Sequence, residues 1–269
     1  MNTWVLLRGL TRESGHWGAF PDMLRARLPG ARVLAIDLPG NGRLNRAQSP
    51  TSIEATMQAC RQQMTALGHS PPVHLLAMSL GAMVAVEWAC RHPEELAGCV
   101  LVNTSLRPFS RWYQRLRPAN YAALLGIMAG AKTSRQREET VLRLTSRHLA
   151  PDVRVIDDWT ALREARPVSG INALRQLLAA ARYQAPVDSP PVPLLVLASR
   201  RDALVNAECS RQLARQWNAA ILEHPTAGHD LPLDDGPWVV EHVARWAGLG
   251  ARRPLTFAHP PGSTPSPGA

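Results

Sequence analysis

Lysine is almost absent from this chain: Lys132 is the only one among 30 basic residues, so arginine carries the positive charge. The formal net charge of +9 is concentrated in residues 107–185, which hold 14 basic and 6 acidic side chains. The sequence shows no basic stretch with the aromatic platforms or groove-reading motifs that nucleic-acid binding needs. Two interpretations stay open for the excess, an arginine-rich solvated surface or a contact with an acidic partner, and nucleic acid is not an expected partner.

Cysteine is scarce, and long apolar runs are absent. The four cysteines form no C-x-x-C pair, which argues against a disulfide framework or a zinc site, so neither a metal nor a cofactor is expected. No apolar run approaches the length that spans a bilayer, and the N-terminal residues lack a basic leader. We therefore expect a soluble cytoplasmic protein without a membrane span.

Short apolar runs alternate with helical patterns along most of the chain. The runs expected to form strands are Thr3–Leu7, Arg32–Ile36, Val73–Met78, Gly98–Val102, Pro193–Ala198 and Ala219–Glu223. The helical patterns between them cover Trp17–Leu28, Ser52–Leu67, Leu80–Arg91, Ala207–Trp217 and Trp238–Trp246. Near-continuous apolarity indicates strands that are buried on both faces. The pattern predicts an α/β fold with a doubly wound, mostly parallel six-stranded sheet.

Residues 107–185 interrupt this alternation with a purely helical stretch. Apolar residues recur there at helical spacing, as in Ile171, Leu174 and Leu178, so these helices are expected to have one apolar face. We expect residues 107–185 to form a helical cap over a core made of residues 1–106 and 186–250. The proline-rich tail, residues 251–269, is expected to be disordered.

Ser79 lies where an apolar strand stops and a helix begins. Ala77 and Gly81, two residues to either side, are small enough to let strand and helix approach closely around a serine in a strained conformation. This pattern is typical of a nucleophile elbow. The alternative is that Ser79 is only the N-cap of the following helix.

A serine hydroxyl needs a base, and the base needs a group that orients it. Asp202 follows one expected strand and His229 follows the next, so both lie at the same sheet edge as Ser79. Ser79, Asp202 and His229 are therefore the candidate catalytic triad. Asp202 could instead be an acid at a helix N-terminus, and Asp230 is interpreted as a local turn acid.

A tetrahedral intermediate also needs hydrogen-bond donors for its oxyanion. The backbone amide of Leu80 follows the nucleophile at the helix N-terminus. The backbone amide of Leu10 lies in the loop after the first strand, where Gly9 gives the backbone the freedom to fold over the elbow. Both amides are candidate oxyanion-hole donors.

Together these residues resemble the α/β-hydrolase superfamily, especially capped bacterial serine esterases, over about residues 3–247. Asp37–Gly42 is similar to the D-x-P-G-x-G loop of that family. The resemblance implies the sheet order 4-3-5-6-7-8 in the family's labels, with the first two strands absent. Arg8, Ala77 and Asn41 depart from the family pattern, and Arg8 is expected to reshape the oxyanion loop or to pair with an acidic substrate. A serine at the elbow excludes the dehalogenases and epoxide hydrolases of this fold, which use aspartate.

The expected function is that of a serine esterase or thioesterase acting on a small-molecule acyl ester or thioester. Similarity to pimeloyl-carrier methyl esterases and the charged insert add an acidic acyl carrier as a candidate partner, with Arg111, Arg115 and Arg117 as candidate contacts. Three alternatives stay open: an acyltransferase on the same triad, a non-catalytic small-molecule-binding protein, and haloperoxidase-like side activity without a cofactor.

Overall fold

The computed structural model describes residues 2–128 and 132–248, and the predicted disordered tail lies outside them. Within these residues six parallel strands form a sheet in the order β2-β1-β3-β4-β5-β6. The strands are β1 (Thr3–Leu7), β2 (Arg32–Ile36), β3 (Val73–Met78), β4 (Leu96–Val102), β5 (Leu194–Ser199) and β6 (Ala220–His224). The predicted sheet and the strand order implied by the resemblance are confirmed.

Side chains from both faces of the sheet are buried. Along β1, Val5 and Leu7 join one apolar cluster, whereas Trp4 and Leu6 join the other. This alternation follows from the two-residue period of a strand, and it explains why the strands are almost continuously apolar in sequence.

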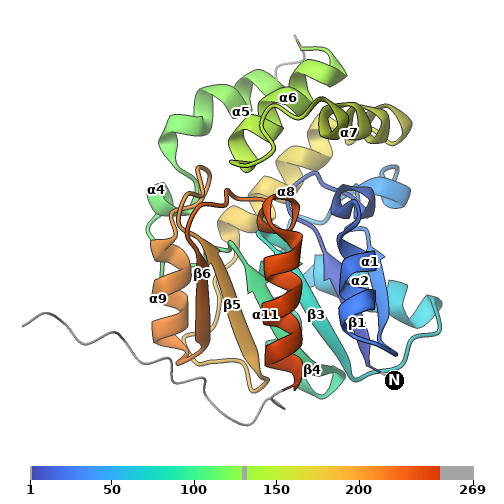
Figure 1. Ribbon diagram of the computed structural model, residues 1–269, viewed down its shortest axis with the longest axis vertical. Helices are drawn as coiled ribbons and strands as arrows, with labels where there is room; N and C mark the ends of the chain where they lie inside the picture. Colours follow the sequence, from blue (N-terminus) through green and yellow to red (C-terminus); the bar gives the residue numbers. More distant parts are fainter. Residues whose placement is uncertain (1, 129–131, 249–269) are drawn as a thin grey trace, which may run out of the picture.

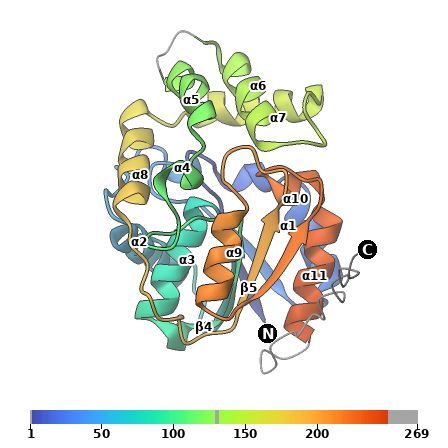
Figure 2. The same ribbon diagram turned by 90° about the vertical axis from the view of Figure 1, so that its left-hand side faces the viewer.

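Helices cover both faces of the sheet (Figures 1 and 2). One face is packed by α1 (Phe20–Arg27) and α11 (Gly236–Gly248), and the other by α2 (Ile53–Ala66), α3 (Leu80–Arg91) and α9 (Glu208–Gln216). A short helix, α10 (Leu231–Asp234), precedes α11. The helix predicted from Trp17 begins only at Phe20, because Gly18 adopts a φ of 51° and separates it from a 3-10 turn at Ser14–Trp17.

The chain between β4 and β5 is helical. It forms α4 (Trp112–Arg115), α5 (Tyr121–Met128), α6 (Ser134–Thr145), α7 (Val153–Ala165) and α8 (Gly170–Arg182). Helices α5, α6 and α7 lie above the carboxyl ends of the strands, and α8 descends beside the sheet (Figures 1 and 2). Leu142, Ile156 and Trp159 form a small apolar cluster between α6 and α7. We call α4–α8 the cap helices.

The orientation of α8 differs from the simplest sequence interpretation. Ile171 and Leu174, expected on an apolar face, are 60% and 52% exposed, whereas Asn172 and Gln176 are buried. The buried amides are hydrogen-bonded to the core, which offsets the cost of removing them from water. Helix α8 therefore packs on the core through two polar side chains as well as through Ala179. Among the described helices, none combines the length and the apolar character needed to cross a membrane.

Candidate active site

Ser79 connects β3 to α3 in an unusual backbone conformation. Its φ of 54° and ψ of −116° lie outside the regions that residues other than glycine normally adopt. The strain persists because both sides of the turn are packed: the Ser79 amide donates to the Val102 carbonyl at 2.9 Å. A Cβ atom on Gly81 would lie only 2.6 Å from the Arg8 carbonyl oxygen and 2.7 Å from that of Leu7. Glycine at position 81 thus lets α3 begin directly against the end of β1.

The loop after β1 lies against Ser79. A Cβ atom on Gly9 would be 3.2 Å from the Ser79 Cβ and 3.6 Å from its Oγ. The absence of a side chain at Gly9 therefore brings the backbone of this loop next to the serine hydroxyl.

Asp202 and His229 are in direct contact. The Asp202 Oδ2 atom lies 2.6 Å from His229 Nδ1. Its other oxygen, Oδ1, accepts the amides of Leu204 at 2.8 Å and Val205 at 2.9 Å, so the carboxylate is fixed at both oxygens. Both side chains are buried, at 2% and 7% exposure. The contact leaves His229 Nε2 as the ring nitrogen available to another group.

The pKa of His229 is raised above its usual value by its neighbours. Burial is the largest single influence and lowers the pKa, but the charge and the hydrogen bond of Asp202 and the charge of Asp230 outweigh it. The positive charge of Arg8 acts in the opposite direction. The local charges thus favour an imidazolium at this position.

Asn103 joins the histidine loop to the sheet edge near Ser79. Its Nδ2 donates to the carbonyl of His229 at 2.8 Å, and its Oδ1 accepts the Ser199 amide at 2.8 Å. The next residue, Thr104, donates through its hydroxyl to the Ser79 carbonyl at 3.1 Å. Loops from β3, β4, β5 and β6 therefore meet at one edge of the sheet, as expected from parallel strands.

The Leu10 and Leu80 amides remain unpaired within residues 2–128 and 132–248. Leu80 is the first residue of α3, where the amide has no intrahelical acceptor. Leu10 lies in a turn closed by the Arg12 amide donating to the Gly9 carbonyl at 3.2 Å. Both candidate donors are thus free to bind an external oxygen.

Arg8 contacts Asp230, the residue that directly follows His229 in the chain. Its Nη1 and Nη2 atoms bond the two carboxylate oxygens of Asp230 at 3.1 and 2.5 Å. Both side chains are at most 3% exposed, and the Arg8 guanidinium also lies 4.9 Å from the centre of the Trp17 ring. The structure therefore replaces the expected pairing with an acidic substrate by an internal ion pair that joins the β1 loop to the histidine loop.

The D-x-P-G-x-G loop, Asp37–Gly42, contacts the chain that follows β1. Asp37 accepts the amides of Ser14 at 2.6 Å and Arg43 at 2.9 Å. Asn41 is fully buried, and its Nδ2 donates to the Arg12 carbonyl at 3.0 Å. These contacts give the loop a structural role next to the β1 turn.

The cap arginines singled out in the sequence have different environments. Arg111 is exposed, and its Nη1 donates to the Tyr113 hydroxyl at 3.0 Å. Arg115 donates to the Ala180 carbonyl at 2.7 Å, and burial lowers its pKa. Arg117 is partly buried. Of these three arginines, Arg111 is the one exposed to solvent.

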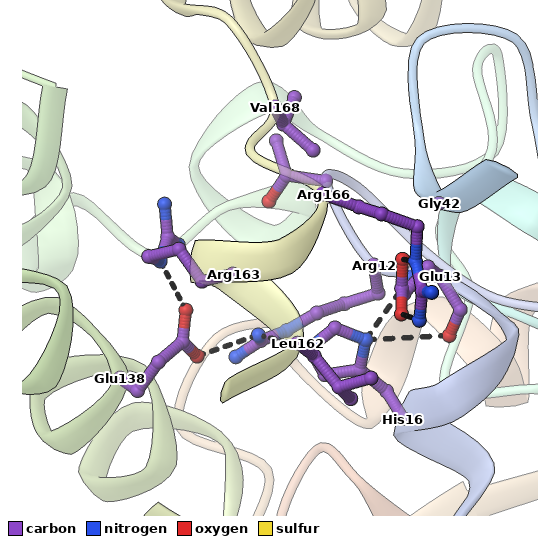
Figure 3. Close-up of a pocket in the computed structure, with 10 residues that line it drawn as sticks. Arg12, Glu13, His16, Gly42, Glu138, Leu162, Arg163, Arg166 and Val168 are labelled. Atoms are coloured by element: carbon purple, nitrogen blue, oxygen red, sulfur yellow. Dashed lines mark hydrogen bonds and ion pairs between the residues drawn. The ribbon is translucent and has the colours of Figure 1, made fainter. Parts of the chain in front are cut away.

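A cluster of buried charges joins the β1 loop to the cap helices (Figure 3). Glu138 of α6 accepts Arg12 Nη1 at 2.6 Å and Arg163 Nε at 2.5 Å. Glu13 accepts two bonds from Arg166, at 2.8 and 2.5 Å. Sequence reasoning missed this cluster, because its members are far apart in the chain and belong to no motif.

One group of possible metal ligands in the described part of the chain lies outside the candidate active site. His92, Glu94 and Glu95 could bring their ligand atoms within 4.8 Å of one another. They lie before β4, at the sheet edge opposite Ser79, and Glu95 already accepts hydrogen bonds from Arg61 and Trp88. This group therefore contributes nothing to the candidate active site.

Comparison with known proteins defines the class. The model of the alpha/beta hydrolase family matches residues 4–242, and the chain belongs to this family. The solved structure of a thermophilic esterase from Thermogutta terrifontis superposes with a TM-score of 0.70 at 21% identity, covering 93% of this chain and 91% of that one. The latter similarity concerns the fold alone.

Two curated relatives are named as esterases of the same kind. The chain is 30% identical to a pimeloyl-[acyl-carrier protein] methyl ester esterase of Chromobacterium violaceum over 237 residues, covering 84% of this chain and 86% of the relative. It is 28% identical to the Aeromonas hydrophila protein of the same name over 205 residues, covering 75% and 77%. The predicted family and the predicted enzyme class, a carboxylic ester hydrolase, agree with these comparisons.

Proposed function

We propose that this protein hydrolyses carboxylic esters or thioesters through an acyl-enzyme on Ser79. His229 accepts the serine proton and later delivers it to the leaving group, and Asp202 orients the imidazole. The amides of Leu80 and Leu10 bind the oxyanion. The observation that carries the proposal is the contact of His229 Nδ1 with a fixed Asp202 carboxylate, at the sheet edge where Ser79 occupies a strained turn.

The reaction proceeds in two similar halves. Ser79 Oγ attacks the acyl carbon as its proton moves to His229 Nε2, and the tetrahedral intermediate collapses when that proton passes to the departing alcohol or thiol. A water molecule, activated by His229, then attacks the acyl-enzyme and releases the acid. No step requires a metal or a cofactor.

The first experiment treats the purified protein with a fluorophosphonate and maps the adduct by peptide mass. Labelling at Ser79 is expected, and Ser79→Ala should lower kcat for ester hydrolysis by a factor on the order of 10⁴ or more, because the nucleophile is lost. Ser70→Ala, at an exposed serine outside the site, is the control and should retain full activity. Full activity of Ser79→Ala on every ester that the wild type cleaves would refute the proposal.

Two alternatives make different predictions in the same assay. An acyltransferase on the same triad would also be labelled at Ser79, but it would pass the acyl group to an added alcohol faster than to water. A non-catalytic binding protein would remain unlabelled while folded. The intact set of Ser79, Asp202 and His229 favours catalysis, since a binding protein has no chemical need for all three.

The candidate partner is an acidic acyl carrier. The Chromobacterium violaceum and Aeromonas hydrophila relatives are named as esterases of an acyl-carrier-protein ester, and residues 107–185 of this chain carry a net charge of +8. Arg111, Arg115 and Arg117 are the proposed contacts, and the exposure of Arg111 makes it the first to test. A cytoplasmic location, where such carriers are found in bacteria, likewise remains a prediction.

Charge reversal tests the carrier contact. Arg111→Glu should raise KM for a carrier-linked acyl ester about 3- to 10-fold at low salt, because it replaces attraction by repulsion, and the difference should shrink as salt is added. The matched control is Arg245→Glu, at an exposed arginine on α11 of the core. A p-nitrophenyl ester of the same acyl group should be cleaved equally by all three proteins. Unchanged carrier kinetics in Arg111→Glu, with no salt effect in the wild type, would argue against a carrier.

A further inference from the structure

The turn that carries Leu10 contains a strained residue. Gly9–Arg12 form a β-turn in which Thr11, the third residue, has a φ of 55°. Type II turns place positive φ at this position and usually fill it with glycine or asparagine. A β-branched side chain rarely adopts such a φ, so contacts from the surrounding structure must hold the turn in place.

Gln176 of α8 supplies one of these contacts. Its Oε1 accepts the Thr11 amide at 2.9 Å. Its Nε2 donates to Asn41 Oδ1 at 2.7 Å and to Ser49 Oγ at 3.1 Å, so both ends of the side-chain amide are bonded. Asn41 in turn donates to the Arg12 carbonyl. Gln176 is only 4% exposed, and its orientation is fixed by the core that it contacts.

Two further cap helices contact the end of the same turn. The Arg12 guanidinium donates to Glu138 of α6 (Figure 3). It also lies 4.2 Å from the centre of the Trp159 ring of α7. Side chains from three cap helices thus contact Thr11 or Arg12, whereas the adjacent Leu10 amide has no bond within the described residues.

We propose that Gln176 is a positioning residue for the oxyanion hole. By accepting the Thr11 amide it holds the turn in the conformation that presents the Leu10 amide to the substrate oxygen. Donors of this kind act in the transition state more than in the bound substrate, so their misplacement lowers kcat more than it raises KM. This inference rests on the proposed function.

The test compares two buried amides on the same face of α8. Gln176→Met removes the acceptor for Thr11 at constant length. Asn172→Leu removes the bonds to Ser49 and Ala47 one turn away and leaves Thr11 untouched. Both variants are assayed for kcat and KM on a short p-nitrophenyl ester, for thermal denaturation, and for inhibition by a trifluoromethyl ketone, whose adduct with serine carries an oxyanion.

Gln176→Met should lower kcat about 10- to 100-fold, which is less than the roughly 10²- to 10³-fold loss when a donor is removed outright. Its KM should change less than about 3-fold, and the ketone should bind more weakly by the same factor as the loss in kcat/KM. Asn172→Leu should stay within about 3-fold of the wild type in kcat, even if it loses similar thermal stability. If the methionine variant does not fold, Gln176→Ser, which leaves room for water, replaces it.

The outcomes separate the two claims. Equal kcat values for Gln176→Met and Asn172→Leu, in a wild type that is labelled at Ser79 and active, would overturn the inference alone. A change confined to KM would also overturn it. A folded wild type that is neither labelled nor active would overturn the proposed function and this inference with it.

Discussion

The ion pair of Arg8 and Asp230 places two opposite charges next to His229, the proposed catalytic base. Asp230 directly follows His229 and raises its pKa, whereas Arg8 lowers it. The pair therefore joins the β1 loop to the histidine loop, and its two charges act on the pKa of His229 in opposite directions, with Asp230 the stronger of the two. A glycine-flanked histidine in sequence gives no indication of such a pair.

The pH dependence of kcat/KM should report on these charges. His229 must be neutral to accept the serine proton, so activity should fall as the pH drops through its pKa, which lies above the usual 6.5. Asp230→Asn removes a charge that raises the pKa and should move this acidic limb to lower pH. Arg8→Met removes a charge that lowers it and should move the limb to higher pH.

These opposite shifts of the acidic limb are tested by measuring kcat/KM between pH 5 and 9 on one ester. A shift of both variants in the same direction would contradict the assignment of the acidic limb to His229. Thermal denaturation is needed as a control, because removing one partner of a buried pair destabilises proteins by about 3–5 kcal/mol. The double variant, which leaves no unpaired charge, should be more stable than Arg8→Met.

Candidate site residues can be chosen from sequence where chemistry and chain order coincide. Ser79, Asp202 and His229 are candidates because each follows a strand, and the sheet topology brings such positions to one edge; their catalytic roles stay predictions. Arg8 was noted only as a departure from a family pattern. Its partner could not be found from sequence, since the two residues are 222 positions apart.

At the scale of elements, the strands were more predictable than the faces of the cap helices. A strand that is buried on both sides must be apolar throughout, so its bounds in sequence and structure differ by two residues at most in this sheet. Helix α8 shows why periodicity is a weaker guide in the cap. Its apolar residues Ile171 and Leu174 face solvent, whereas Asn172 and Gln176 are buried beside Ala179 and form hydrogen bonds that exist only in the folded chain.

Glu138 should be a main stabilising contact between α6, α7 and the β1 loop. Its pKa is lowered: burial alone would raise it, but the charges of Arg12 and Arg163 outweigh that effect. Glu138→Gln leaves two guanidinium groups without a compensating charge and should lower the free energy of unfolding by about 3–5 kcal/mol. Glu139→Gln, which breaks an exposed pair with Arg135, should cost about 0–1 kcal/mol.

Urea denaturation at pH 7 compares the two variants, and equal losses would show that the buried cluster has no special role. The sign of the pH effect follows from the lowered pKa. The stability contributed by ionised Glu138 is present above the usual carboxyl pKa of 4.5 and is lost as the pH falls through the lower folded-state value. The difference between wild type and Glu138→Gln should therefore shrink in acid.

At the scale of the whole molecule, the candidate active site draws on both parts of the chain. The core contains the proposed triad of Ser79, Asp202 and His229, and the cap helices contact the β1 turn through Gln176 and Glu138. The layered sheet and the place of the helical insert followed from the alternation of apolar runs. The polar contacts between insert and core did not, because they join residues that are far apart in the chain and belong to no motif.

The contacts of Gln176 and Glu138 with the β1 turn have a consequence for chimaeras of α/β-hydrolases. Exchanging the segment between β4 and β5 for that of a relative, in order to change the acyl group accepted, treats the cap as a module that only shapes a pocket. Here the incoming segment would also have to supply an acceptor for Thr11 and a carboxylate for Arg12. If Gln176 has the proposed role, substrate range and catalytic competence are inherited together in this chain.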